Sequence, residues 1–315
     1  MTSRTLRFVA GIDGGQSSTT AVVVDERGII RGRGTSGPAD HVDEPPGSTK
    51  CAAALSAALS EATIAAGLPR GTLFDAVVAG VSGYDATFDG APVRLPARAQ
   101  KILHDAPIAL AGATPSRPAV VVISGTGSVA YGEDAARSAV TVGGWGYLFG
   151  DEGSAYAIAR DALAAAMRAD DRRELSPLGD AALAYFDRRD LRSLATAALR
   201  GRLSRAAIAA FARVVHDAAR LGDAEADAIV GSAADSLAQL AANAIARLAT
   251  AGRAVRVSFS GGAFANDAFG MRCADALAAL APDAIVEAPR YPPAVGAALL
   301  AFALADLGVP ERIVE

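Results

Sequence analysis

The chain has 315 residues, 51% of them hydrophobic, and a formal net charge of −4. Its length suggests two domains, and its composition permits substantial cores. The absence of a long basic run argues against nucleic-acid binding. The apolar stretch at residues 291–305 is shorter than the roughly 20 residues of a membrane span, and residues 1–11 do not resemble a signal peptide. We therefore expect a soluble, cytoplasmic protein with no membrane partner.

Apolar periodicity predicts the elements of the first half. In chain order these are strands over residues 6–12, 19–25 and 28–36, a helix over 48–67 and a strand over 74–83. Residues 92–100 are ambiguous, and a short helix is the interpretation considered there. Residues 101–113 predict a strand that runs into a helix, with Asp105 near the junction.

The same plan restarts near residue 118. Residues 118–134 predict strand, Gly-rich turn and strand, 137–146 a third strand, and 151–250 helices. Residues 255–267 predict a strand, a Gly-rich turn and a helix start, 283–289 a last strand, and 292–308 a last helix. We interpret the repetition as a duplicated β-β-β-α unit, which predicts two domains facing a central cleft. The expected domains are residues 1–116 and residues 117–315, the second with a helical insertion and with its last helix free to pack back on the first.

Four Gly-rich stretches follow or open strand segments, at residues 13–18, 124–128, 143–153 and 260–263. Such turns let the backbone approach an anion closely. The first adds one acid and several hydroxyls, which suit phosphate and Mg²⁺, although a hairpin turn explains its glycines equally well. G-x-x-x-x-G-K-S/T is absent, and the turn at residues 125–130 is not G-x-G-x-x-G because Ala130 stands where the third glycine should be, which argues against a P-loop and a dinucleotide enzyme. Together the four turns predict a nucleotide cleft.

The segments "DGGQSSTT", "HDAPIALAGA", "VVVISGTGS", "GGWGYLFGDEGSAYAIARDAL", "SFSGGAFAND" and "PPAVGAALLA" together resemble the BadF/BadG/BcrA/BcrD ATPase family. Within that family they are most similar to N-acetylglucosamine and glucosamine kinases. The resemblance covers nearly the whole chain and is weakest at residues 40–46 and 168–226. It implies the actin-like, hexokinase-like α/β fold, with two RNase H-like domains and ATP between them. It also implies a homodimer.

The resemblance assigns roles by position. It implies that Asp13 holds Mg²⁺ and that Asp105 is the catalytic base at the sugar hydroxyl. The residues it implies at ATP are Gly14, Gly15 and Ser17 in a first phosphate loop, Gly125, Thr126 and Gly127 in a second, and Gly261 and Gly262 at adenosine. Trp145 and Asp151 match sugar-contacting positions, and Asp40 stands where these kinases usually carry an asparagine that contacts the sugar.

Each role has a structural alternative. Asp13 could start a turn, Asp105 and Asp151 could each cap the helix that follows, because Asp is a good N-cap, and Trp145 could be core.

The sequence thus predicts an ATP-dependent kinase that phosphorylates the 6-hydroxyl of glucosamine or N-acetylglucosamine. The alternative is an ATPase that acts as an activator or nucleotide sensor for a partner protein. Activators in the same family carry an iron–sulfur cluster bound by cysteines. Here Cys51 and Cys273 fall in predicted helices and are not suitably placed.

Overall fold

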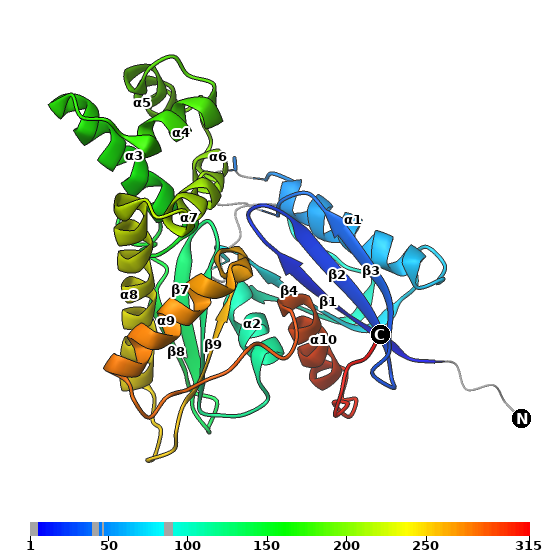
Figure 1. Ribbon diagram of the computed structural model, residues 1–315. Helices are drawn as coiled ribbons and strands as arrows, with labels where there is room; N and C mark the ends of the chain where they lie inside the picture. Colours follow the sequence, from blue (N-terminus) through cyan, green and yellow to red (C-terminus); the bar gives the residue numbers. More distant parts are fainter. Residues whose placement is uncertain (1–5, 40–43, 46, 85–90) are drawn as a thin grey trace, which may run out of the picture. The chain divides into compact units, whose positions relative to one another are not determined.

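The computed structural model describes residues 6–39, 44–45, 47–84 and 91–315 (Figure 1). The chain divides into two compact units. Unit 1 comprises Met1–Ser116 and Ala288–Glu315, and unit 2 comprises Arg117–Glu287. The C-terminal segment therefore groups with unit 1. Within the described ranges, no helix has both the length and the apolar composition that crossing a membrane requires.

Unit 1 is built on a mixed sheet whose strands follow the order β3-β2-β1-β4-β5. Its strands are β1 (Phe8–Gly14), β2 (Thr19–Asp25), β3 (Ile30–Ser36), β4 (Phe74–Val81) and β5 (Ala97–His104). The first three strands pair antiparallel, whereas β4 and β5 continue the sheet in parallel from β1. This arrangement confirms the predicted order of the first three strands and brings the ends of three parallel strands to one edge.

Helices cover both faces of this sheet (Figure 1). Alternate residues of a strand face opposite sides, so Ala10 and Ile12 of β1 pack with α1 (Lys50–Ala65), whereas Val9 packs with α10 (Pro293–Leu304). α2 (Asp105–Ala113) lies beside α10 on the second face, where its Ile108 joins the same core.

Unit 2 repeats this plan with the order β10-β9-β6-β7-β8. Its strands are β6 (Ala119–Ser124), β7 (Ser128–Glu133), β8 (Ala139–Gly143), β9 (Arg256–Ser260) and β10 (Ile285–Val286). Antiparallel and parallel pairings match those of unit 1 strand for strand. The duplicated α/β plan predicted from sequence is therefore confirmed, although the two units share a pattern more than they share residues.

Between β8 and β9 the chain is helical, as predicted. The helices are α3 (Ala155–Arg172), α4 (Pro177–Phe186), α5 (Leu191–Leu199), α6 (Arg205–Ala210), α7 (Ala212–Arg220) and α8 (Ala224–Arg247), and η1 (Gly262–Ala265) and α9 (Asp267–Leu280) follow β9. Short polar side chains set several starts, because Ser176, Asp190 and Asp223 accept a backbone N–H of the first turn. Alanine-rich faces then pack into one core with the sheet.

One predicted element is wrong. Residues 92–100 do not form a short helix, because β5 begins at Ala97 and pairs in parallel with β4. The Gln100 side chain holds the preceding segment extended, since its amide nitrogen donates to Val93 O at 2.8 Å and its oxygen accepts from Leu95 N at 2.8 Å. The exposed polar side chains of this edge strand hid its apolar alternation.

A substitution at Gly11 tests how closely α10 packs on the unit 1 sheet. A Cβ at this position would overlap the backbone of Ala294 and Ala298 in α10. We expect Gly11→Ala to lower the melting temperature, because overpacking typically costs about 1–3 kcal/mol. Gly231→Ala in α8 is the matched control, since nothing lies within 4 Å of the added Cβ and alanine favours a helix by up to about 1 kcal/mol. Equal melting temperatures for Gly11→Ala and the wild type would contradict this packing.

Candidate functional site

Two of the predicted carboxylates lie at the same edge of the unit 1 sheet. Asp13 of β1 is level with Gly80 of β4, and Gly80 is level with Leu103 of β5. Asp105 follows two residues later as the first residue of α2. A Cβ on Gly80 would lie only 3.1 Å from the Asp105 Cα, so a glycine there lets the acid sit close against β4. Ligands of open α/β sheets bind beyond the carboxyl ends of parallel strands.

Asp13 has an unusual protonation equilibrium. Burial, followed by the nearby charge of Asp105, raises the pKa of Asp13 to about 7. In the described part of the chain, no arginine or lysine forms an ion pair with it. A half-buried acid without a cation has chemistry that suits a divalent metal ion.

The first Gly-rich turn is a hairpin between β1 and β2. It is closed by the Gly15 N–H, which donates to Ser18 O at 2.9 Å, and it carries Gly14, Gly15 and an exposed Ser17. Asp13 lies before the turn, paired with Thr20 inside the two-stranded ladder. The hairpin therefore does not need the Asp13 carboxylate, which leaves that group without a structural task.

His104, not Asp105, caps α2. The Nδ1 of His104 accepts the Ala106 N–H at 3.1 Å, and the same nitrogen lies 2.8 Å from Oδ1 of Asp105. One nitrogen either accepts or donates, so neutral His104 caps the helix and protonated His104 donates to Asp105. Burial lowers the pKa of His104, but the hydrogen bond and charge of Asp105 outweigh it and the net pKa is raised. Sequence reasoning treated His104 as structural or surface and missed this contact.

In unit 2, the second Gly-rich loop joins β6 to β7. Gly125, Thr126 and Gly127 form a tight loop in which the Gly125 N–H donates to Gly127 O at 2.9 Å. Gly261 lies against this loop with a φ of +106°, and a Cβ there would overlap the backbone of Ser124. Gly262 follows with open space around it. The structure thus brings the predicted phosphate-loop and adenosine residues of unit 2 together.

The carboxylate of Asp151 supports this second loop through a hydrogen bond. Its Oδ1 accepts the Ser128 N–H at 3.1 Å, and its Oδ2 lies 2.7 Å from Nη2 of Arg205. A Cβ on Gly127 would lie 2.9 Å from both carboxylate oxygens. Burial raises the pKa of Asp151, while the Ser128 N–H and the Arg205 charge oppose that rise. The N-cap of α3 is Ser154, so the capping alternative for Asp151 is wrong.

Further hydrogen bonds join the second loop to the segment after Asp151. The Ser128 hydroxyl donates to Glu152 O at 2.7 Å, the Ser124 hydroxyl donates to Gly153 O at 3.0 Å, and the Ala155 N–H donates to Gly125 O at 2.9 Å. These three hydrogen bonds connect the loop directly to this segment.

Arg205 is a site residue that sequence reasoning missed. It is the first residue of α6, and its guanidinium lies 5.1 Å from the Tyr147 ring centroid and 5.9 Å from that of Tyr156, distances typical of cation–π contacts. Fifty-four positions separate it from Asp151, and no local pattern marks that pairing.

Trp145 is 76% exposed, so the core alternative for this residue is wrong. It lies with the exposed side chains of Leu148 and Phe149 in the loop that follows β8. Such a face is able to pack against the apolar side of a sugar ring. Asp40 and its neighbour His41 lie outside the described residues.

No group of three or more His, Cys, Asp or Glu side chains in the described ranges is placed to hold a metal ion. Cys51 is buried in α1 of unit 1, and Cys273 is buried in α9 of unit 2, where burial raises the pKa of its thiol to about 12. A thiol at that pKa is protonated and a poor metal ligand.

The fold is that of sugar kinases and actin-like ATPases. A glucokinase of the ROK family from Streptomyces griseus, solved with glucose and AMPPNP, shares it at a TM-score of 0.56 and 18% identity, over 95% of this chain and all of that one. A candidate N-acetylglucosamine kinase from Chromobacterium violaceum aligns with a TM-score of 0.75 and 27% identity, over 94% of this chain and 99% of that one.

The sequence then identifies the family. The BadF/BadG/BcrA/BcrD ATPase family matches residues 10–301, and the chain belongs to that family. An N-acetylmuramic acid/N-acetylglucosamine kinase from Clostridium acetobutylicum is 33% identical over 166 residues, which is 52% of this chain and 54% of that protein. The match thus spans about half the length of this curated relative.

The Arg205–Asp151 pair yields a stability prediction. Arg205→Met should lower the melting temperature of the protein, because an unpaired buried carboxylate costs about 1–3 kcal/mol. Asp151→Asn combined with Arg205→Met should cost less than the sum of the two single changes. Arg213→Met, which removes an exposed arginine of α7, is the control. Additive effects in the double variant would contradict the pairing.

The raised pKa of Asp13 yields a pH prediction. In the unfolded chain its pKa is the ordinary 3.8, so the stability from neutral Asp13 is complete below about pH 4 and is lost as the pH rises through 7. Asp13→Asn cannot ionise. In EDTA it should therefore melt at least roughly 2 °C above the wild type at pH 8, with no difference near pH 4. Parallel pH profiles for the two proteins would show that Asp13 is not perturbed; exposed Asp161→Asn is the control.

Proposed function

We propose that the protein is an ATP-dependent kinase that transfers the γ-phosphoryl group to the 6-hydroxyl of an amino sugar, glucosamine or N-acetylglucosamine. The observation that carries the proposal is the placement of Asp13 and Asp105 at one edge of the unit 1 sheet. The relatives support the same direction, since one acts on N-acetylmuramic acid and N-acetylglucosamine and another is a candidate N-acetylglucosamine kinase.

Asp13 is the residue we assign to Mg²⁺, directly or through water. A single carboxylate is sufficient, because Mg²⁺ usually keeps several waters and takes other ligands from substrate phosphates. The ion neutralises charge on the phosphates during transfer. A bound dication would also keep Asp13 ionised at neutral pH, where its own pKa leaves it only partly so. In the hairpin beside it, Gly14, Gly15 and Ser17 offer N–H and hydroxyl groups to the phosphates.

Asp105 is the residue we assign as catalytic base. Phosphoryl transfer has a loose transition state, so orienting the hydroxyl matters as much as removing its proton. A carboxylate on the first residue of a helix, in contact with His104, is restricted in the positions it can take. That restriction favours orientation of a substrate hydroxyl.

Unit 2 supplies the second set of contacts to ATP in this proposal. Gly125, Thr126 and Gly127 receive phosphate oxygens, and Gly261 and Gly262 receive the adenosine. Asp151 keeps the second loop in shape through the Ser128 N–H.

The sugar contacts assigned to this chain are Trp145, Asp151 and Asp40. Trp145 is exposed enough to pack against a ring. Asp40 tilts the choice toward glucosamine, because a carboxylate pairs with an ammonium and does not suit an acetamide carbonyl.

Asp105→Asn tests the proposal most simply. General-base loss typically costs about 10²–10⁴-fold in rate, so kcat for sugar-dependent ADP release should fall at least about 100-fold. Melting temperature and ATP affinity should stay near those of the wild type, since His104 caps the helix. Asp161→Asn, an exposed residue of unit 2, is the matched control.

Turnover near that of the wild type in well-folded Asp105→Asn protein would remove Asp105 from the chemistry. Slow ADP release that no hexose or amino sugar stimulates would instead support the alternative, an ATPase that acts as an activator or nucleotide sensor for a partner protein.

A further inference from the structure

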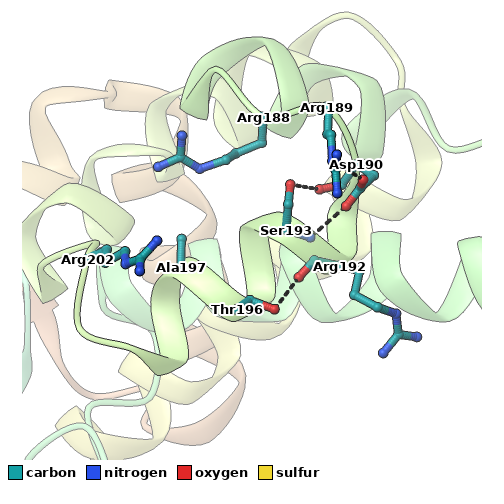
Figure 2. A pocket seen from close by; sticks show the side chains of 8 residues that line it. All are labelled: Arg188, Arg189, Asp190, Arg192, Ser193, Thr196, Ala197 and Arg202. Carbon is teal, nitrogen blue, oxygen red and sulfur yellow. Dashed lines mark hydrogen bonds and ion pairs between the residues drawn. The ribbon is translucent and has the colours of Figure 1, made fainter.

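A cavity of about 520 Å³ in unit 2 is lined by none of the residues assigned to the proposed kinase site. It sits around α5, within the helical insertion. Its lining is dominated by arginines: Arg188, Arg189, Arg192 and Arg202, together with Asp190, Ser193, Thr196 and Ala197 (Figure 2). The first two arginines precede α5, and Arg202 follows it.

The net charge around this cavity is opposite in sign to the net charge of the whole chain. Residues 188–202 contain five arginines and one aspartate, a net charge of +4, whereas the whole chain carries −4. Asp190 is already engaged, because it accepts the Ser193 N–H at 2.6 Å and lies 2.9 Å from Nε of Arg189. The composition of the chain as a whole therefore does not explain why these arginines cluster around the cavity.

The other lining arginines lack carboxylate partners in the described part of the chain. Arg188 donates only to a backbone carbonyl, that of Asp187 at 3.1 Å, and no ion pair forms at Arg192 or Arg202. Some exposed arginines elsewhere in the same unit do have a carboxylate partner, as Arg172 does in Glu174. Gathering unpaired cations costs free energy by repulsion, and an anion would remove that cost.

The side-chain directions identify the two arginines that matter most. Arg188 and Arg202 extend their guanidinium groups toward the same part of the cavity from opposite ends of α5, with Ala197 between them, whereas Arg192 points away (Figure 2). Two guanidinium groups facing one space match the oxygens of a phosphate, because each planar fork binds two oxygens at once.

We propose that this cavity binds the phosphate group of a small phosphate monoester, such as a sugar phosphate. Its volume leaves room beside the phosphate for the organic part of the ligand. Ser193 and Thr196 also line the cavity, and their hydroxyls donate to Asp190 O at 2.7 Å and to Arg192 O at 2.8 Å. The cavity lies in the segment, residues 168–226, where the resemblance to the kinase family is weakest. The site therefore goes beyond the proposed transfer reaction, although the product of that reaction falls within this class of ligand.

Isothermal titration of the full chain with glucosamine 6-phosphate tests the site. Excess AMPPNP and glucosamine keep ligand out of the proposed kinase site, and about 150 mM NaCl screens long-range attraction. Arg188→Gln combined with Arg202→Gln should weaken binding at least about tenfold, because each change removes charge-assisted hydrogen bonds to the phosphate. Arg168→Gln combined with Arg213→Gln removes the same charge from exposed positions of α3 and α7 and should change binding less than about twofold.

Absence of binding to the wild type, or equal losses in both double variants, would overturn the proposal. Inorganic phosphate is the second probe, and an affinity equal to that of the sugar phosphate would overturn assignment to a monoester. Unchanged melting temperatures exclude unfolding as the cause of a loss. Because the titration requires no turnover, its failure is distinguishable from failure of the proposed kinase activity.

Discussion

The parallel pairing of β1, β4 and β5 is the constraint on which the candidate chemistry of unit 1 depends. It sets Asp13, Gly80 and Leu103 level with one another, so that Asp105 begins α2 at the edge where Asp13 ends its strand. The position of Asp13 has an electrostatic cost, since burial and, to a smaller extent, the charge of Asp105 raise the pKa of Asp13 to about 7. A site that holds two acids together in this way suits a metal ion and a proton acceptor.

Unit 2 has the same sheet plan, but its main constraint is the Gly-rich loop between β6 and β7. Its second loop is rich in glycine, and a loop of that kind is entropically costly to hold in one shape. The Asp151 carboxylate holds it through the Ser128 N–H, and Arg205 neutralises that buried acid from the helical insertion. The insertion therefore supports the loop by charge as well as by packing.

Much of the fold could be predicted from sequence, because buried strands and amphipathic helices leave strong periodic patterns. The duplicated strand order and the Asp105 junction were both visible in this way. The second half of β5 was predicted within residues 101–113, but its first half, from Ala97, was missed because polar, exposed side chains hide the apolar alternation. The Arg205–Asp151 pair and the His104 cap were missed for another reason: both depend on side-chain geometry, which spacing along the chain does not encode.

The central claim is that this protein transfers a phosphoryl group from ATP to a hydroxyl group of a sugar. The most direct measurement is phosphorus–proton correlation NMR of the product formed from ATP, Mg²⁺ and glucosamine or N-acetylglucosamine. The account predicts one new phosphate monoester whose phosphorus couples to the two protons on carbon 6, formed in step with ADP. ADP formed equally with and without sugar, and no phosphorylated sugar in the spectrum, would contradict it.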